Sequence, residues 1–183
     1  MEPLIFVTGN AGKLREAEAA LHRPVRGWEM HLEELQTTDM AHLVRHKALQ
    51  AHAQVGRPLF VEDTALTFRA WGDLPGPYCK DFLGNLGLEG LVRALAPFAD
   101  DRAVALTVIG YHDGQSVHIF RGEVAGRIEG PRGSGGFGWD PIFVPAGAAL
   151  TFGEMDLAQK APYSMRVRAL AALAAHLDQP AAT

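Results

Sequence analysis

Short apolar runs and amphipathic segments alternate along the first third of the chain. Residues 4–7 and 59–61 are consecutive large apolar side chains, which predicts two buried strands, because neighbouring strand residues point to opposite faces. Between these strands, apolar residues recur at helical spacing over 14–21 and again over 41–55. The order strand, helix, helix, strand predicts an α/β layer.

The second half of the chain carries a strand pattern of a different kind. Residues 103–111 are apolar on both faces, which is typical of a central strand. Asp113-Gly114 is a hairpin turn signal, and residues 117–128 follow it as a second long strand. This half of the sheet is therefore predicted to be antiparallel.

Two more helices complete the predicted architecture. One covers about 88–98, with Pro97 near its end, and the last is capped at Ser164 and buries a stripe of Leu170, Leu173, Ala174 and Leu177. We expect a single α/β domain over residues 1–183, with a mixed sheet, a long antiparallel β-ribbon and flanking helices. Its elongated shape is expected to form two lobes around a central cleft, the default place for a binding site.

Composition limits the cellular compartments and the binding partners that we expect for this protein. A formal net charge of −4 argues against a nucleic-acid-coating protein. The single cysteine, Cys79, cannot form an internal disulfide, which favours a reducing compartment, and we expect it to be a small buried apolar residue. No apolar run approaches the ~20 residues of a membrane span, and the first residues lack a signal peptide. We expect a cytoplasmic protein that binds neither nucleic acid nor membrane.

Lysine is rare among the basic residues. Of 17 lysines and arginines, only four are lysines: Lys13, Lys47, Lys80 and Lys160. An ammonium is a compact charge that suits a phosphate oxygen, whereas arginine offers a planar fork. The alternative is a compositional bias that left four lysines at random.

Two carboxylates follow the predicted strand 59–61. Glu62 and Asp63 are expected at its exit, the edge where open α/β sheets bind ligands. The alternative is an ordinary turn that begins with acids. Adjacent strand residues face opposite ways, so both acids can bind one metal only if the chain turns between them. Asp63 is therefore the candidate catalytic residue. Glu62 is expected to contact the residues around the site and not the metal itself.

A tight turn joins the first strand to the first helix. Gly9 and Gly12 allow close approach of backbone N–H groups to an anion, Asn10 is a natural N-cap, and Lys13 adds a full charge. The spacing differs from the Walker loop, and the turn alone is a weak signal for phosphate. Glu16 and Glu18 are expected on helix faces away from the core.

Residues 133–141 concentrate glycines around Phe137, Trp139 and Asp140. An aromatic face beside glycines could stack on a flat base, and the acid could bind the same ligand. The alternative is a flexible loop whose aromatics fold into the core. The eight histidines show no zinc spacing and are expected at the surface, and no serine or cysteine lies in a nucleophile motif.

With these stretches assembled, the sequence resembles the inosine triphosphate pyrophosphatase family, enzymes that hydrolyse non-standard purine nucleoside triphosphates. The resemblance spans nearly the whole chain in the family's order. The matching motifs are Thr8-Gly9-Asn10 with Lys13, Glu34 before Leu35-Gln36, Val61-Glu62-Asp63-Thr64, Leu74-Pro75-Gly76-Pro77-Tyr78 with Lys80, Phe137-Gly138-Trp139-Asp140-Pro141, and residues 152–160.

The resemblance implies Mg²⁺-dependent attack of water on the α-phosphorus of ITP, dITP or XTP, giving the monophosphate and pyrophosphate. It implies Glu34 and Asp63 as metal ligands, with Asp63 also the proton acceptor, and a homodimer as the assembly. The residues implied to bind the nucleotide are Thr8, Gly9, Asn10, Ala11, Gly12, Lys13, Lys47, Thr64, Lys80, Phe137, Gly138, Trp139, Asp140, Lys160, Met165 and Arg166.

The sequence departs from the family's pattern at three positions. Met165 and Ala161 stand where the family usually has histidine and asparagine, and Asp73 where a glycine is common. Loss of the histidine removes a donor near the 6-oxo edge of the base, so purine discrimination is expected to be blunted. Two alternatives stay open: a related pyrophosphatase acting on modified pyrimidines or GTP, and a nucleotide-binding module that does not hydrolyse.

Overall fold

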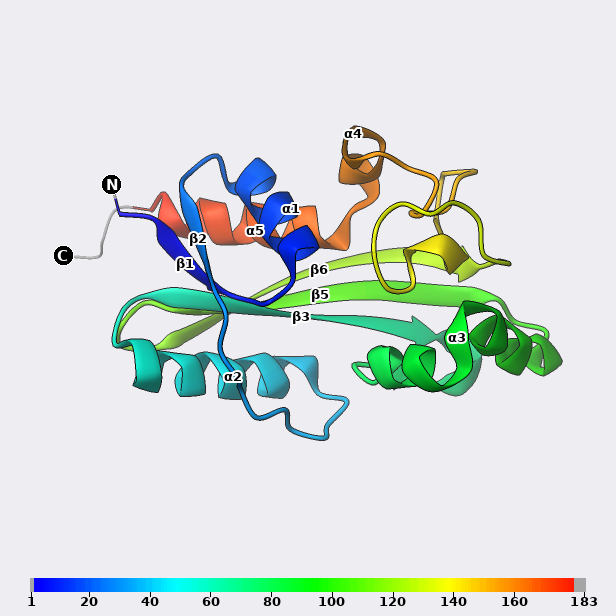
Figure 1. The fold of residues 1–183 in the computed structure, drawn as a ribbon, viewed down its shortest axis with the longest axis horizontal. Coiled ribbons are helices and arrows are strands. Elements are labelled where there is room, and N and C mark those ends of the chain that lie inside the picture. Colours follow the sequence, from blue (N-terminus) through cyan, green and yellow to red (C-terminus); the bar gives the residue numbers. More distant parts are fainter. Residues whose placement is uncertain (1, 180–183) are drawn as a thin grey trace. The chain divides into compact units, whose positions relative to one another are not determined.

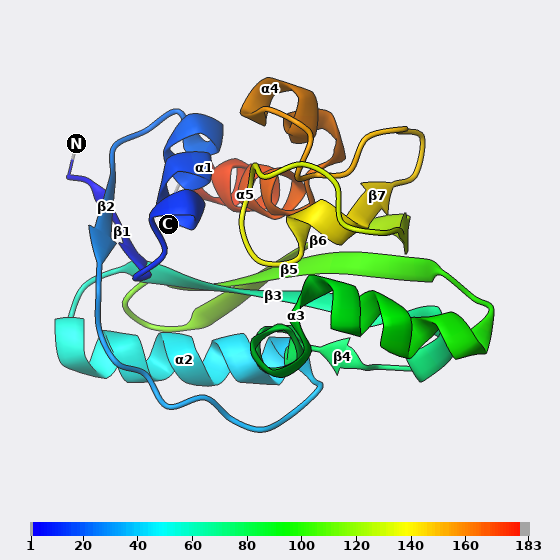
Figure 2. The same cartoon turned by 45° about the vertical axis from the view of Figure 1, so that its right-hand side comes forward.

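The computed structural model describes residues 2–179. Its strands are β1 (Leu4–Val7), β2 (Val25–Trp28), β3 (Leu59–Phe68), β4 (Pro75–Gly76), β5 (Arg102–His112), β6 (Val117–Ile128) and β7 (Phe143–Pro145). Its α-helices are α1 (Ala11–Leu21), α2 (Met40–Val55), α3 (Cys79–Leu95), α4 (Leu157–Lys160) and α5 (Met165–Leu177), with short 3-10 turns between some of them. Figure 1 colours these elements from blue to red along the sequence, and Figure 2 also labels β4 and β7.

The strands form one mixed sheet, as predicted. Their hydrogen-bonded order is β2-β1-β3-β5-β6-β7, and β4 pairs with β3. β1 runs parallel to both β2 and β3, whereas β7 is antiparallel to β6. β5 and β6 are neighbours joined only by residues 113–116, a connection that is long enough for an antiparallel pair and too short for a parallel one. The predicted α/β class and the β-ribbon are confirmed.

The chain divides into two compact units, which are described separately. Unit 1 comprises Met1–Asp63, Thr107–Gly122 and Arg166–Thr183, and unit 2 comprises Thr64–Leu106 and Glu123–Met165. β3, β5 and β6 each contribute residues to both units. The expectation of one domain with a central cleft stays a prediction.

Unit 1 buries its apolar residues on both faces of its sheet. α2 covers one face, and α1 and α5 cover the other (Figures 1 and 2). Phe6 of β1 and Phe60 of β3 stack with ring centroids 4.2 Å apart, and Leu173 of α5 joins the same cluster. Because α1 and α2 lie on opposite faces, consecutive residues of β3 meet different helices.

Two predicted boundaries are wrong. β3 does not stop before Glu62 and Asp63 but continues to Phe68, so both acids lie inside a strand. The apolar pattern resumes at Ala65, and each acid has a cationic partner, so the strand can hold both of them. The helix predicted from residue 88 begins at Cys79 and is interrupted at Gly87, whose φ of 68° is not helical.

Unit 2 has an apolar core of its own, which includes Phe68, Cys79, Phe143 and Phe152. Cys79 is 2% exposed, and burial raises the pKa of its thiol to about 12, which confirms it as a buried apolar residue. Trp139 joins this cluster at 8% exposure. Of the two interpretations of the glycine-rich stretch, packing of its aromatics into the core therefore holds for Trp139.

Two further observations bear on the predictions. Over residues 2–179, no helix has the length and apolar character needed to cross a membrane. The expectation that histidines lie at the surface is wrong for His112, which is 5% exposed. Its ring stacks on that of His52, with centroids 3.7 Å apart.

Candidate functional site

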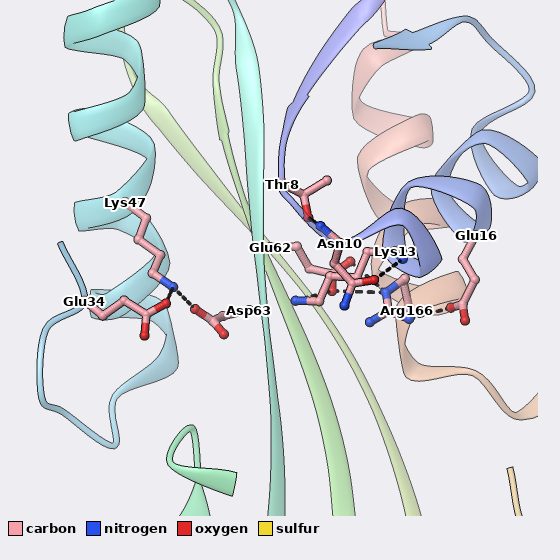
Figure 3. A network of polar contacts seen from close by, with 9 residues as sticks. All are labelled: Thr8, Asn10, Lys13, Glu16, Glu34, Lys47, Glu62, Asp63 and Arg166. Atoms are coloured by element: carbon pink, nitrogen blue, oxygen red, sulfur yellow. Dashed lines mark hydrogen bonds and ion pairs between the residues drawn. The ribbon is translucent and has the colours of Figure 1, made fainter. Parts of the chain in front are cut away.

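The acids of β3 are divided between the two faces of the sheet in unit 1. Figure 3 shows Asp63 on the side of α2 and Glu62 on the side of α1 and α5. The side chain of Glu62 is 0% exposed, whereas that of Asp63 is 19% exposed. The expectation that these adjacent strand residues face opposite ways is confirmed.

On the α2 side, Lys47 lies between two carboxylates. Its Nζ donates to Glu34 Oε1 at 2.7 Å and also to Asp63 Oδ2. Burial lowers the pKa of Lys47, but Asp63 and Glu34 outweigh burial and raise the pKa above its ordinary value. Lys47 is therefore charged at neutral pH, and its ammonium holds two acids from distant parts of the chain.

The two acids fit a hard divalent cation. Glu34 Oε1 and Asp63 Oδ2 both reach the same cationic atom, so one positive centre can be shared between them. Mg²⁺ is bound through one or two carboxylates and completes its shell with water and phosphate oxygens. Among residues 2–179 there is no cluster of three or more acid, histidine or cysteine side chains suited to a metal.

The turn before α1 is built as the sequence predicts. Asn10 is the N-cap of α1, and its Oδ1 accepts from the backbone N–H of Lys13 at 3.0 Å. Thr8 Oγ1 accepts from the N–H of Asn10 at 3.0 Å. Gly9 and Gly12 lie between these polar groups, and Ala11 begins the helix. The start of the helix thus combines its partial positive charge with the ammonium of Lys13.

On the α1 side, a buried charge network surrounds Arg166. Its Nε donates to both oxygens of Glu62, at 3.0 and 2.9 Å, and its Nη1 donates to Glu16 Oε2 at 2.5 Å. Lys13 Nζ lies 3.4 Å from Glu62 Oε1. Burial lowers the pKa of Arg166, but the charges of Glu62 and Glu16 outweigh it and raise the pKa above its ordinary value.

This network corrects one prediction. Glu16 does not face away from the core but is 8% exposed, because its carboxylate is needed beside the fully buried Arg166. An unpaired buried guanidinium would cost several kcal/mol, and two carboxylates and two cations make the group electrically neutral. Helical spacing could not reveal this, because the arginine is 150 residues away in sequence.

In unit 2, Asp140 is the centre of a second polar group. Its Oδ2 accepts from the backbone N–H of Phe137 at 2.9 Å and from Lys160 Nζ at 2.8 Å. The Lys160 ammonium lies 5.2 Å from the ring centroid of Phe137 and 4.9 Å from that of Phe152. Gly136 has a φ of 71°, and a Cβ there would lie 2.0 Å from Asp140 Oδ2, so only glycine permits this contact.

The remaining predicted residues of unit 2 lie in varied surroundings. Thr64 follows Asp63 in β3 and is half-buried. Lys80 is exposed in the first turn of α3, and Gly138 is exposed with a φ of 63°. Met165 is 2% exposed and packs in the apolar core of unit 2. The structure therefore surrounds Met165 with apolar side chains, which suits methionine and not a charged donor.

The fold and these polar groups define a class of protein: a mixed-sheet α/β protein with a capped helix start that carries a lysine, and with a second lysine held between two carboxylates. The chain belongs to the Ham1 family, whose model matches residues 4–176. It is 45% identical over 176 residues to inosine triphosphate pyrophosphatase 1 of Trypanosoma cruzi (strain CL Brener), a match that covers 93% of this chain and 90% of the relative.

Solved structures show the same fold. A HAM1 protein from Coxiella burnetii superposes with a TM-score of 0.84 at 26% identity, covering 97% of this chain and 98% of the other. A nucleoside-triphosphatase, described as a dITP/XTP pyrophosphatase, from Mycobacterium abscessus gives a TM-score of 0.71 at 27% identity, covering 94% and 98%. These likenesses extend over nearly the whole chain.

Proposed function

We propose that this chain hydrolyses non-standard purine nucleoside triphosphates, ITP, dITP and XTP, to the nucleoside monophosphate and pyrophosphate. One observation carries the proposal: the Lys47 ammonium holds the carboxylates of Glu34 and Asp63 around a single cationic centre. Asp63 lies on β3, which pairs with β1, the strand that leads into the turn before α1. The printed names of the relatives, which are inosine triphosphate and dITP/XTP pyrophosphatases, give the substrate class. Membership of the Ham1 family supports both the arrangement of these residues and the substrate class.

The proposed reaction is attack of water on the α-phosphorus. Mg²⁺ held by Glu34 and Asp63 would neutralise charge on phosphate oxygens and make a bound water more acidic. Asp63 accepts the proton of the attacking water, an oxygen–phosphorus bond forms, and the bond to the bridging oxygen of pyrophosphate breaks. Lys13 and the start of α1 bind phosphate oxygens, with Thr8 and Asn10 shaping the turn. With Mg²⁺ bound by Glu34 and Asp63, the Lys47 ammonium would be available to bind a phosphate oxygen of the substrate.

The residues of unit 2 are proposed to bind the same nucleotide. Phe137 offers its ring to the base, while Asp140 and Lys160 form a preset polar pair beside it. Lys80 supplies a further charge for the phosphates. The roles of Thr64, Gly138, Trp139, Met165 and Arg166 in binding stay predictions of the resemblance. For Arg166, the two carboxylates around its guanidinium support a role in holding Glu62.

Four further properties are proposed from the resemblance and composition. The chain is a single catalytic domain with two lobes around a cleft, and it works as a homodimer. It acts in the cytoplasm on a small nucleotide, with no nucleic acid or membrane as partner. Sedimentation of the purified protein tests the dimer directly.

The test is release of pyrophosphate from ITP, dITP, XTP and GTP, with and without Mg²⁺. We expect Mg²⁺-dependent release, with one ¹⁸O from labelled water appearing in the monophosphate. Asp63→Asn should lower the rate by about 10²–10⁴-fold, because the proton acceptor is lost. Asp73→Asn is the matched control, since Asp73 is exposed and is proposed to take no part. Full activity of Asp63→Asn would contradict the mechanism.

Two other functions would give different results. A pyrophosphatase for modified pyrimidines would release pyrophosphate from those substrates and not from ITP. A binding module would show nucleotide affinity without release under any metal condition. Two carboxylates placed where phosphates bind favour hydrolysis, because uncompensated acids would weaken a simple binder of anions.

A further inference from the structure

A side-chain cluster on α2 holds the chain segment that carries Glu34. Gln50 Oε1 accepts from the backbone N–H of Glu33 at 2.9 Å. Gln50 Nε2 donates to Glu33 Oε2 at 3.4 Å and lies 2.8 Å from His46 Nε2. The amide of Gln50 thus binds both the backbone and the side chain of the residue just before Glu34.

These three contacts also fix which way the Gln50 amide points. The backbone N–H of Glu33 requires an acceptor, and the Glu33 carboxylate requires a donor. Only the orientation with Oε1 toward the N–H meets both demands. His46 Nε2 must then be the acceptor, so His46 carries its proton on Nδ1 when it contacts the amide. The donors and acceptors of this cluster match one another.

Glu34 needs such support because its segment has no regular structure. Residues 29–37 lie between β2 and α2 outside any helix or strand, and the side chain of Glu34 is 70% exposed. The salt bridge from Lys47 is one anchor. In the proposed reaction a cation competes with Lys47 for this carboxylate, so the anchor is weakened when the metal is bound.

We propose that Gln50 is a positioning residue that keeps Glu34 in place for the metal ion. Gln50 lies three residues after Lys47 on α2, so both side chains extend from one side of the helix. Lys47 binds the Glu34 side chain, and Gln50 binds the backbone beside it. The inference rests on the proposed function, because it takes Glu34 to be a metal ligand. The Gln50 contacts remain available when Lys47 turns to the substrate.

The test replaces Gln50 by methionine, which has a similar length and no amide. Gln54→Met is the matched control: Gln54 lies one turn later on α2 and is exposed. Binding of Mn²⁺ alone, a paramagnetic substitute for Mg²⁺, is followed by electron paramagnetic resonance. Steady-state pyrophosphate release from ITP is measured over a range of Mg²⁺ concentrations, and the unfolding temperature is measured without metal.

We expect Gln50→Met to weaken Mn²⁺ binding about five-fold and to raise the Mg²⁺ concentration for half-maximal rate similarly, as for loss of one hydrogen bond. Excess Mg²⁺ should restore the rate, and Gln54→Met should match the parent. Equal metal affinity in Gln50→Met and Gln54→Met would overturn the inference. A rate loss that excess Mg²⁺ does not restore, together with a lowered unfolding temperature, would also overturn it, since Gln50 would then be only structural.

The same measurements separate this inference from the proposed function. A parent that binds Mn²⁺ but releases no pyrophosphate contradicts the proposed function alone, and weaker Mn²⁺ binding in Gln50→Met would still support positioning. A parent that hydrolyses ITP while Gln50→Met is unchanged contradicts the positioning role alone. A parent that neither binds Mn²⁺ nor hydrolyses ITP contradicts both.

Discussion

Glu62 and Asp63 are adjacent in sequence, and their carboxylates lie on opposite faces of the same sheet. Glu62 binds the buried Arg166, while Asp63 binds Lys47 on the α2 side. The alternation of β3 assigns one acid to a buried structural network and the other to a more accessible candidate metal position. Each acid therefore allows a separate kind of experiment.

Removal of the Glu16 charge should destabilise the protein. In Glu16→Gln, Arg166 loses one of its two carboxylate partners while it stays buried, and we expect the free energy of unfolding to fall by about 3 kcal/mol. Glu18→Gln is the matched control, because Glu18 is exposed on the same helix. Urea unfolding measures both variants. Equal stability of the two would show that Glu16 does not support Arg166.

Stability should fall in mildly acidic solution because of His112. Burial, followed by the charge of His52, lowers the pKa of His112 below its ordinary value of 6.5. Between the depressed pKa and about pH 6.5, the unfolded chain therefore binds a proton at His112 more readily than the folded protein does. Neutral His112 contributes to the free energy of unfolding above about pH 6.5, and this contribution is lost as the pH falls through the depressed pKa. Asp113 opposes the shift, and His118 adds to it.

The pH effect can be assigned with one substitution. His112 Nδ1 accepts a hydrogen bond from the backbone N–H of Gly114 at 3.0 Å. His112→Asn keeps an acceptor for this N–H and removes the titrating ring. Urea unfolding at pH 7.5 and 5.5 should show a smaller loss of stability in this variant than in the parent. His31→Asn, at an exposed position, should behave like the parent. A pH dependence unchanged in His112→Asn would contradict the assignment.

Base selectivity should respond to position 165. Met165→His restores the side chain usual in the inosine triphosphate pyrophosphatase family and should raise the preference for ITP and XTP over GTP by about two- to ten-fold, as for one added hydrogen bond. Because Met165 is buried among apolar residues, the same change should lower the unfolding temperature. Ratios of kcat/KM on the three nucleotides measure the effect, and unchanged ratios would refute it.

Removal of the buried hydroxyl of Thr107 should stabilise the protein. Thr107 is 0% exposed, and within residues 2–179 its Oγ1 is one of two buried side-chain polar atoms without a hydrogen-bond partner. Thr107→Val keeps the shape and removes the unpaired group, so the free energy of unfolding should rise by about 1 kcal/mol. Thr38→Val, at an exposed position, should change little. A destabilised Thr107→Val would indicate that the hydroxyl has a partner in solution.

Local pattern was sufficient for several features. The two strands of the β-ribbon, the cap at Asn10, the helix α2 and the buried Cys79 follow from alternation, spacing and composition. For the ribbon strands, the cap and α2, the residues that form the feature are neighbours in sequence or share one face of one element. Rules that use only neighbouring residues are therefore enough to predict these features. The short strand β2 was missed, because four residues with one glycine carry no clear alternation.

The sequence by itself determined which residues can carry charge, turn the chain or pack, and through its motifs it indicated a nucleotide-hydrolysing family. Only the tertiary structure decided how those charges pair: Glu16 with Arg166 across 150 residues, Glu62 with Arg166 across 104, and Gln50 with the backbone of Glu33. The physical reason is that periodicity shows only which face of one helix or strand is apolar. A buried ion pair depends instead on where the sheet places distant segments, and on the cost of burying either charge alone.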